Sequence, residues 1–193
     1  MNTPGHLVLN FAILGSGKKP RNYFPIAIAS ILPDIPIFIF YIYQRYFLDM
    51  PDILTWGVIY YSPEWQDLFD LFHSFPIAVA GFLIFQIFGF EKTAIIFAAI
   101  GMHSVFDIFV HAEDAHRHFF PFIGWRFESP VSYWNPRHFG LLGAAIEIIL
   151  VSAAALIVFK RDPAKWIRYL LTLILLFYFA GTILLVLFFN EVI

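Results

Sequence analysis

Residues 166–189 read WIRYLLTLILLFYFAGTILLVLFF, and this apolar stretch indicates the class of fold expected for the whole chain. No charged residue lies between Arg168 and Glu191, and the stretch contains no histidine. A helix needs about 20 mainly apolar residues to cross the roughly 30 Å hydrocarbon core of a bilayer. Residues 166–189 therefore predict a plain transmembrane helix that faces lipid or packs against other helices.

The rest of the chain has the same character. Of its 193 residues, 60% are hydrophobic, 20% are aromatic and 13% are charged, whereas soluble domains carry about 25% charged residues. Further crossings are predicted at residues 24–47, 75–90 (starting as early as 65), 93–110 and 139–159. Residues 3–14 are too short to span and predict a re-entrant or packed helix, with Thr3 as N-cap and Pro4 in its first turn. We expect an all-α integral membrane protein with about five transmembrane helices, in a single domain covering residues 1–193.

Charge and composition indicate the orientation of the chain in the membrane and restrict its partners and its metal ligands. Segments 15–23, 91–92 and 160–168 carry eight of the twelve Lys and Arg residues, which predicts that they share the cytoplasmic side. A net charge of -2 with mixed signs gives no broad basic surface, so nucleic acid is not an expected partner. The chain has no cysteine, which excludes disulfides and thiolate metal sites. Any metal must be held by nitrogen and oxygen ligands.

Three of the predicted crossings each contain one interior carboxylate, namely Asp34, Asp107 and Glu147, and the interiors of these crossings contain no Lys or Arg. An ionised carboxylate near the centre of a membrane helix costs about 2.5 to 3.5 kcal/mol on insertion scales. Counted from the cytoplasmic helix ends, these acids together with His6 and His103 lie at depths of about 15 to 21 Å. A shared metal ion would neutralise all three acids, whereas the alternative is that each is protonated and hydrogen-bonded. His73, at about 27 Å, would have to approach from nearer the outer surface unless Pro76 kinks its helix.

The stretch HSVFDIFVH places His103, Asp107 and His111 at i, i+4 and i+8, along one stripe of a helix. Imidazoles and a carboxylate on consecutive turns can point to one ion, with neighbouring helices supplying the remaining ligands. The competing interpretation is a hydrogen-bonded polar pair between helices. The pattern indicates a metal site inside the helix bundle.

The stretch EDAHRHFFPF, residues 113–122, follows at the outer end of this crossing. His116 and His118 could complete a second metal position or protonate a leaving group, although a solvated surface loop would have the same composition. Arg126, with Arg117 and Arg137, could hold an anionic substrate oxygen or anchor the chain at the membrane interface. Asp70 precedes His73 by three residues, which predicts that Asp70 orients the imidazole of His73.

At these residues the chain resembles the YdjM-type family of bacterial inner-membrane metal-dependent hydrolases, which is itself compared with zinc-dependent phospholipase C. The matching motifs are Pro-Gly-His ending at His6, Leu-Pro-Asp ending at Asp34, His73-Ser74, His103-x-x-x-Asp107, and Trp125-Arg126-Phe127 followed by Pro130. Their order and rough spacing agree with the family, and the match extends to about His138. Ile35 and Pro36 follow Asp34 where family members often carry a further Asp.

The resemblance implies that His6, Asp34, His73, His103 and Asp107 are metal ligands, with Asp107 as the bridge if two ions bind. It also implies a multi-pass protein of the bacterial inner membrane, and we expect its site to open to the non-cytoplasmic side. From the spacing in the third crossing, His111 joins the expected ligand set. Zinc is the preferred ion for this ligand set, with manganese or iron as alternatives.

The preferred function is a membrane-bound metal-dependent hydrolase that uses metal-activated water on a phosphoester or ester of a small amphiphilic or lipid substrate. Asp107 or Glu147 would steer the water, His116 or His118 would protonate the leaving group, and Arg126 would hold the anionic oxygen. A metal-ion or proton-coupled transporter would use the same buried acids and histidines. A haem-binding protein and a non-catalytic, metal-stabilised membrane protein are further alternatives.

Overall fold

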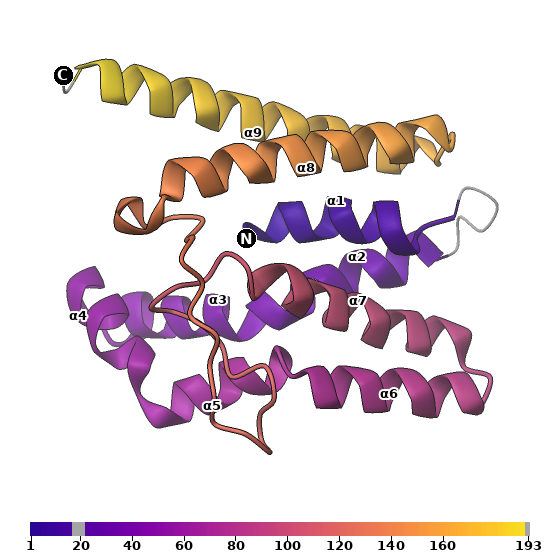
Figure 1. Ribbon diagram of the computed structural model, residues 1–193, viewed down its shortest axis with the longest axis horizontal. Helices are drawn as coiled ribbons and strands as arrows, with labels where there is room; N and C mark the ends of the chain where they lie inside the picture. Colours follow the sequence, from indigo (N-terminus) through magenta and orange to yellow (C-terminus); the bar gives the residue numbers. More distant parts are fainter. Residues whose placement is uncertain (17–21, 192–193) are drawn as a thin grey trace.

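The computed structural model describes residues 1–16 and 22–191, with side chains described up to Gly181, and every regular element in these residues is a helix (Figure 1). The elements are α1 (Thr3–Leu14), α2 (Tyr23–Ile31), η2 (Leu32–Asp34), α3 (Ile35–Ile42), η3 (Tyr43–Phe47), α4 (Asp52–Gly57), η4 (Ile59–Tyr61), α5 (Pro63–Phe72), α6 (Phe75–Ile87), α7 (Glu91–Asp107), η5 (Pro136–His138), α8 (Gly140–Lys160) and α9 (Lys165–Glu191). The predicted all-α class is confirmed.

Among the described residues, three helical segments are long and apolar enough to cross a membrane, namely Tyr23–Phe47, Pro63–Ile87 and Gly140–Lys160. They match the crossings predicted at 24–47, at 75–90 with its earlier start, and at 139–159. α7 has 17 residues and is shorter than these three. The crossing predicted at 166–189 falls in α9, and its side chains after Gly181 lie outside the described part of the chain. The number of about five crossings therefore remains a prediction.

Two of these three segments are interrupted inside the bundle. The first changes from α2 to the short 3₁₀ turn η2 at Pro33, which has no N–H to donate to the preceding turn. The second is divided between α5 and α6 at His73 and Ser74, where the Ser74 hydroxyl caps α6 by accepting from the backbone N–H of Ile77. Both interruptions bring irregular backbone, and with it polar side chains, into the interior of the protein.

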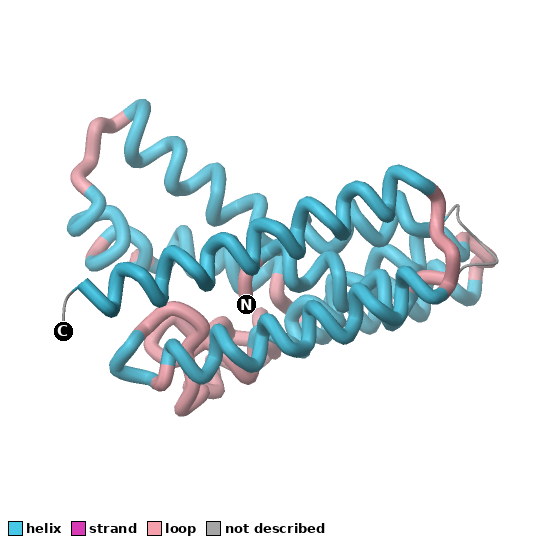
Figure 2. Tube along the Cα trace, turned by 90° about the horizontal axis from the view of Figure 1, so that it is seen from above, coloured by secondary structure: helices cyan, strands magenta, loops and turns pink. Residues whose placement is uncertain are grey.

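The short helix α1 lies at the centre of the fold, in contact with α2, α7 and α8 (Figures 1 and 2). All of its residues from Gly5 to Ala12 are buried, which is expected of a helix that is apolar on every side. The prediction of a packed N-terminal helix is confirmed, but Thr3 is not its N-cap. Asn2 occupies that position, and the Thr3 hydroxyl donates instead to Asp34.

The connections between the helices lie at two ends of the bundle. The α6–α7 and α8–α9 connections and the adjacent ends of α1 and α2 lie together at one end, on the right of Figure 1. The other end carries α4 and the long segment 108–139. The two basic segments 91–92 and 160–168 therefore share an end, as predicted, while part of segment 15–23 lies outside the described residues.

Candidate metal centre

The carboxylate of Asp107, at the last residue of α7, is the centre of a buried cluster of imidazoles. Its Oδ2 atom lies 3.0 Å from His103 Nε2 and 3.5 Å from His73 Nε2. Asp34 Oδ1 lies 3.5 Å from His103 Nε2 and 4.0 Å from His73 Nε2. Two histidines and two aspartates from three separate parts of the chain therefore face a common point.

The spacing of these four donor atoms is close to that of ligands around a tetrahedrally coordinated ion. Ligands bound to zinc at about 2.0 to 2.2 Å in tetrahedral geometry lie about 3.3 to 3.6 Å from one another. The four separations run from 3.0 to 4.0 Å. The Nε2 atoms of His73 and His103 are buried without a hydrogen-bond partner, which is costly unless a ligand occupies the point between them. Asp34, His73 and His103 form a set of donors that could hold a metal ion, and Asp107 Oδ2 adjoins both of these histidines.

The ring orientation of both imidazoles is set by backbone carbonyls. His103 Nδ1 donates to the Ser30 carbonyl at 2.9 Å, and His73 Nδ1 donates to the Phe69 carbonyl at 2.8 Å. Each proton is thereby placed on Nδ1, which leaves the Nε2 lone pair directed at the carboxylates. Metal-bound histidines are usually oriented by such hydrogen bonds.

A second group of nitrogens surrounds Asp107 Oδ1. His6 Nε2 lies 2.9 Å from this oxygen, His111 Nε2 lies 3.3 Å away, and the α-amino group of Met1 donates to it at 2.8 Å. The contact of His6 Nε2 with Asp107 is not a well-aligned hydrogen bond, its Nδ1 has no hydrogen-bond partner, and the ring is fully buried and stacked on His103. His6, His103 and Asp107 form a further set of donors that could hold an ion.

His111 joins the cluster from the segment that follows α7, and not from the helical stripe that its spacing predicted. The expected i, i+4, i+8 stripe is wrong for its last member, because α7 ends at Asp107 and His111 follows in a turn. His111 Nδ1 donates to Asp114 Oδ2 at 2.9 Å, and Trp134 Nε1 donates to the same oxygen at 3.0 Å. Burial alone would raise the pKa of Asp114, but these hydrogen bonds outweigh it and hold the pKa below its usual value. Asp114 thus presents a negative charge that orients His111.

Thr3 and Asp114 both belong to the site, although sequence reasoning assigned neither to it. Thr3 Oγ1 donates to Asp34 Oδ2 at 2.5 Å, so that Asp34 Oδ1 remains directed at the histidines. The His-x-x-Asp spacing from His111 was a signal for Asp114. No signal marked Thr3 as the partner of a residue 31 positions later.

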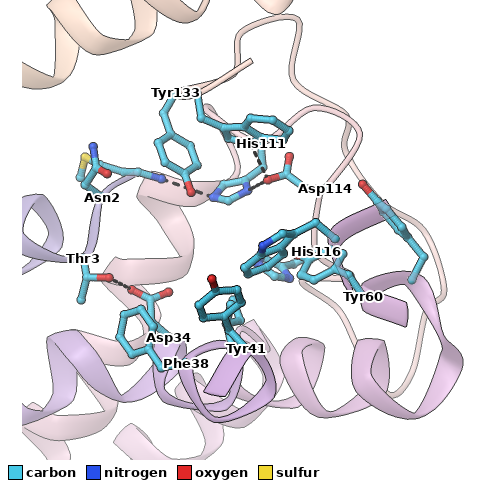
Figure 3. Close-up of a pocket in the computed structure, with 15 residues that line it drawn as sticks. Asn2, Thr3, Asp34, Phe38, Tyr41, Tyr60, His111, Asp114, His116 and Tyr133 are labelled. Carbon is cyan, nitrogen blue, oxygen red and sulfur yellow. Dashed lines mark hydrogen bonds and ion pairs between the residues drawn. The ribbon is translucent and has the colours of Figure 1, made fainter. Parts of the chain in front are cut away.

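A cavity of about 650 Å³ opens beside the cluster, and Figure 3 shows Asp34, His111 and His116 pointing into it. Its walls are mainly aromatic and include Tyr41, Trp56, Tyr60, Tyr133 and Trp134. Tyr41 and Trp56 stack with ring centroids 5.3 Å apart. The cavity gives a ligand with an apolar portion access to the Asp34 side of the cluster.

The two histidines of the outer segment are buried rather than solvated. His116 stacks on His73 with ring centroids 3.9 Å apart, and His118 stacks on Phe75 at 5.2 Å. Burial, followed by the neighbouring His73, lowers the pKa of His116 to about 3 and that of His118 to about 4. Both rings are therefore neutral at neutral pH in the metal-free protein. Their assignment to leaving-group protonation stays a prediction.

Asp70 is fully buried, but it does not orient His73 as predicted, because the Nδ1 atom of His73 is taken by the Phe69 carbonyl. Its carboxylate instead accepts from the backbone N–H and the guanidinium of Arg117, and it lies 3.4 Å from His116 Nδ1. Asp70 therefore fastens the outer segment, and with it His116, to α5.

The arginines predicted at the mouth are not among the residues that line the cavity. Arg117 pairs with Asp67 and Asp70. Arg126 donates to the Gln66 side chain at 2.9 Å and to the Ala115 carbonyl at 3.1 Å. Contact between Arg126 and a substrate oxygen stays a prediction. Arg137 lies in η5, beyond the residues that form the cavity.

Glu147, on α8, is buried next to the start of α1, and its side chain accepts hydrogen bonds from Asn2 and Tyr178 rather than from the described histidines. Its proposed action on water stays a prediction. The predicted ligands His6, Asp34, His73, His103, Asp107 and His111 are all brought together.

The fold and the site together define a class of protein: an all-helical chain with segments able to cross a membrane and a buried histidine–aspartate cluster that could bind metal. Comparisons of the chain with protein-family models, with curated proteins and with solved structures found no match. The likeness to the YdjM-type family therefore rests on the motifs quoted above.

Proposed function

We propose that this protein is a membrane-bound hydrolase that depends on a divalent metal, preferably zinc, held by Asp34, His73, His103 and Asp107. The observation that carries the proposal is the pair of buried imidazoles whose Nδ1 atoms are tied to carbonyls while their Nε2 atoms face two carboxylates. A purely structural hydrogen-bond network would be expected to align those Nε2 atoms with the carboxylates, and although they lie 3.0 to 4.0 Å from carboxylate oxygens they make no well-aligned hydrogen bond. His6 and His111, on Asp107 Oδ1, would hold a second ion.

When bound, such an ion polarises an ester or phosphoester oxygen and lowers the pKa of a water molecule. The chain's own residues supply the positioning. Thr3 holds Asp34 at the edge of the cavity, and the aromatic walls would bind the apolar part of an amphiphilic substrate there. His116, which lines the cavity next to His73, is placed to exchange a proton with a substrate group.

The first test is elemental analysis of the detergent-purified wild type and of Asp107→Ala, with Glu128→Gln as a control that changes an exposed acid outside the site. Wild type and the control should contain zinc or another divalent metal, and Asp107→Ala should contain much less. The metal-loaded proteins are then assayed on lipid phosphodiesters, lipid phosphomonoesters and carboxylester lipids. Equal metal in all three proteins would overturn the ligand assignment.

Hydrolysis that is present in wild type and lost in Asp107→Ala supports the proposed function. If wild type holds metal but cleaves none of these lipids, the hydrolase proposal fails. Sealed vesicles loaded with a zinc-sensitive dye then distinguish the remaining candidates, since a transporter would move zinc across the bilayer and a metal-stabilised protein would not.

A further inference from the structure

The carboxylate of Glu147 makes an unusually concentrated set of hydrogen bonds for an acid inside a candidate membrane span. One oxygen, Oε1, accepts from the Asn2 backbone N–H at 3.1 Å, from the Asn2 side-chain amide at 3.0 Å and from the Tyr178 hydroxyl at 2.5 Å. The side chain is 3% exposed. Because a buried acceptor is costly unless donors surround it, these three bonds indicate a defined role for Oε1, whereas Oε2 is buried without a hydrogen-bond partner.

All of these contacts converge on the start of α1. Asn2 immediately precedes the helix, and Gly5 lies one turn later against the same group. A Cβ atom at Gly5 would come 2.8 Å from Tyr178 Oη and 3.1 Å from Glu147 Oε1, so a larger residue cannot fit without displacing one of them. The next residue is His6, whose Nε2 lies 2.9 Å from Asp107 Oδ1.

We propose that Glu147, together with Tyr178, is a positioning residue that holds the start of α1 so that His6 and Thr3 face the metal centre. The inference rests on the proposed metal site, but it assigns Glu147 a different part from that of a carboxylate acting on water. Glu147 is absent from the walls of the cavity beside the cluster, whereas its contacts with α1 are direct. A 12-residue helix takes its position from such contacts, because its own length does not fix it in a bilayer.

The test compares Glu147→Gln with Glu147→Leu in the full-length protein. Gln keeps an oxygen at the position of Oε1, whereas Leu removes the acceptor while filling similar space. Zinc affinity is measured by competition with a chromophoric chelator in detergent. We expect Glu147→Gln to bind zinc close to wild type and Glu147→Leu to bind it about 10- to 100-fold more weakly, the usual effect of losing a partner that orients a ligand. Gly5→Ala, which displaces the same contact from the other side, should weaken zinc binding as well.

Measuring substrate hydrolysis by Glu147→Gln distinguishes a positioning role of Glu147 from a catalytic one. A catalytic carboxylate would make Glu147→Gln inactive at unchanged zinc affinity, and that result would overturn the proposal. Equal zinc affinity in wild type and Glu147→Leu would also overturn it.

A measurement without metal keeps this inference separate from the proposed function. The chain has no cysteine, so cysteines placed at the exposed positions Ile13 on α1 and Leu141 on α8 can carry a pair of spin labels. The distance between the labels should change in Glu147→Leu and stay the same in Glu147→Gln. If wild type binds no zinc, the proposed function fails, and the label distances still decide whether Glu147 positions α1.

Discussion

At the scale of single residues, the site depends on hydrogen bonds that fix which atom of each side chain faces the cluster. The Thr3 hydroxyl takes Asp34 Oδ2, and the carbonyls of Ser30 and Phe69 take the Nδ1 protons of His103 and His73. Asp34 Oδ1 and the Nε2 atoms of His103 and His73 are therefore left facing the cluster. The donor set is therefore arranged before any ion arrives, which lowers the cost of binding one.

Removing the Thr3 hydroxyl should weaken metal binding without unfolding the protein. Thr3→Val keeps the shape of the side chain but leaves Asp34 Oδ2 without its donor, so the carboxylate loses its fixed orientation. We expect zinc affinity to fall about 10- to 100-fold, measured by chelator competition. Thr3→Ser should bind close to wild type, and Thr172→Val on α9 provides a control for the loss of a threonine hydroxyl outside the site. Unchanged affinity in Thr3→Val would exclude an orienting role for Thr3.

At the scale of elements, helix ends inside the bundle supply the site with polar groups. Ser30 lies in the last turn of α2 and Phe69 in the last turn of α5. Their carbonyls accept the histidine protons, and the Phe69 carbonyl also accepts from the backbone N–H of His73 at 3.2 Å. The acceptors that orient the imidazoles therefore lie beside the interruptions after Ile31 and Phe72.

The contact between α5 and the outer segment should depend on a single buried acid. Asp70 is fully buried and pairs with Arg117, whereas the side chain of Asp67, which pairs with the same guanidinium, is 55% exposed. Asp70→Asn should lower the free energy of unfolding of the metal-free protein by about 3 kcal/mol, because a neutral amide replaces the buried carboxylate that accepts from both the backbone N–H and the guanidinium of Arg117. Asp67→Asn should change it by less than about 1 kcal/mol. Denaturant titrations in detergent measure both, and similar losses in the two variants would contradict this assignment.

Hydropathy was enough to predict the helical class and the limits of the three long apolar segments. The breaks within them were only partly predictable. Pro33 and Pro76 mark their places in the sequence, but a proline does not specify whether a helix kinks or ends. The end of α7 at Asp107 was missed for a different reason, because Ile108, Phe109 and Val110 continue the apolar pattern and only tertiary contacts of the following turn stop the helix.

The members of the cluster were predictable because acids and histidines are rare in apolar segments and therefore conspicuous. Their partners were not, since Thr3, Ser30 and Phe69 are ordinary residues whose roles arise from contacts with distant parts of the chain. The misassigned partner of His73 illustrates the limit. Spacing placed Asp70 near it, while the structure directs that acid toward Arg117.

At the scale of the whole molecule, the cluster joins segments that lie far apart in the sequence. Its members come from α1, η2, the α5–α6 break, α7 and the turn after α7. An ion bound there would connect all of these segments at one point. Its binding energy would then add to the stability of the fold as a whole.

Removing the metal should therefore lower the unfolding temperature of wild type. With free ion at about 100 times its dissociation constant, binding stabilises the folded state by about 2.7 kcal/mol, and a chelator removes that contribution. Thermal unfolding is followed in detergent with and without chelator. Asp107→Ala should unfold at the same temperature in both conditions, and an equal response in wild type and the variant would show that the chelator acts elsewhere.

Hydrogen bonds at both ends of α1 join it to a part of the chain that is synthesised much later. Asn2 is bonded to Glu147, and at the other end of the same helix the carbonyls of Phe11 and Gly15 accept from Arg161. During translation, α1 leaves the ribosome well over a hundred residues before the part of α8 that receives it. Until α8 has been made, the face of α1 that α8 covers in the folded protein has no partner, and this face is a candidate surface for insertion factors or chaperones.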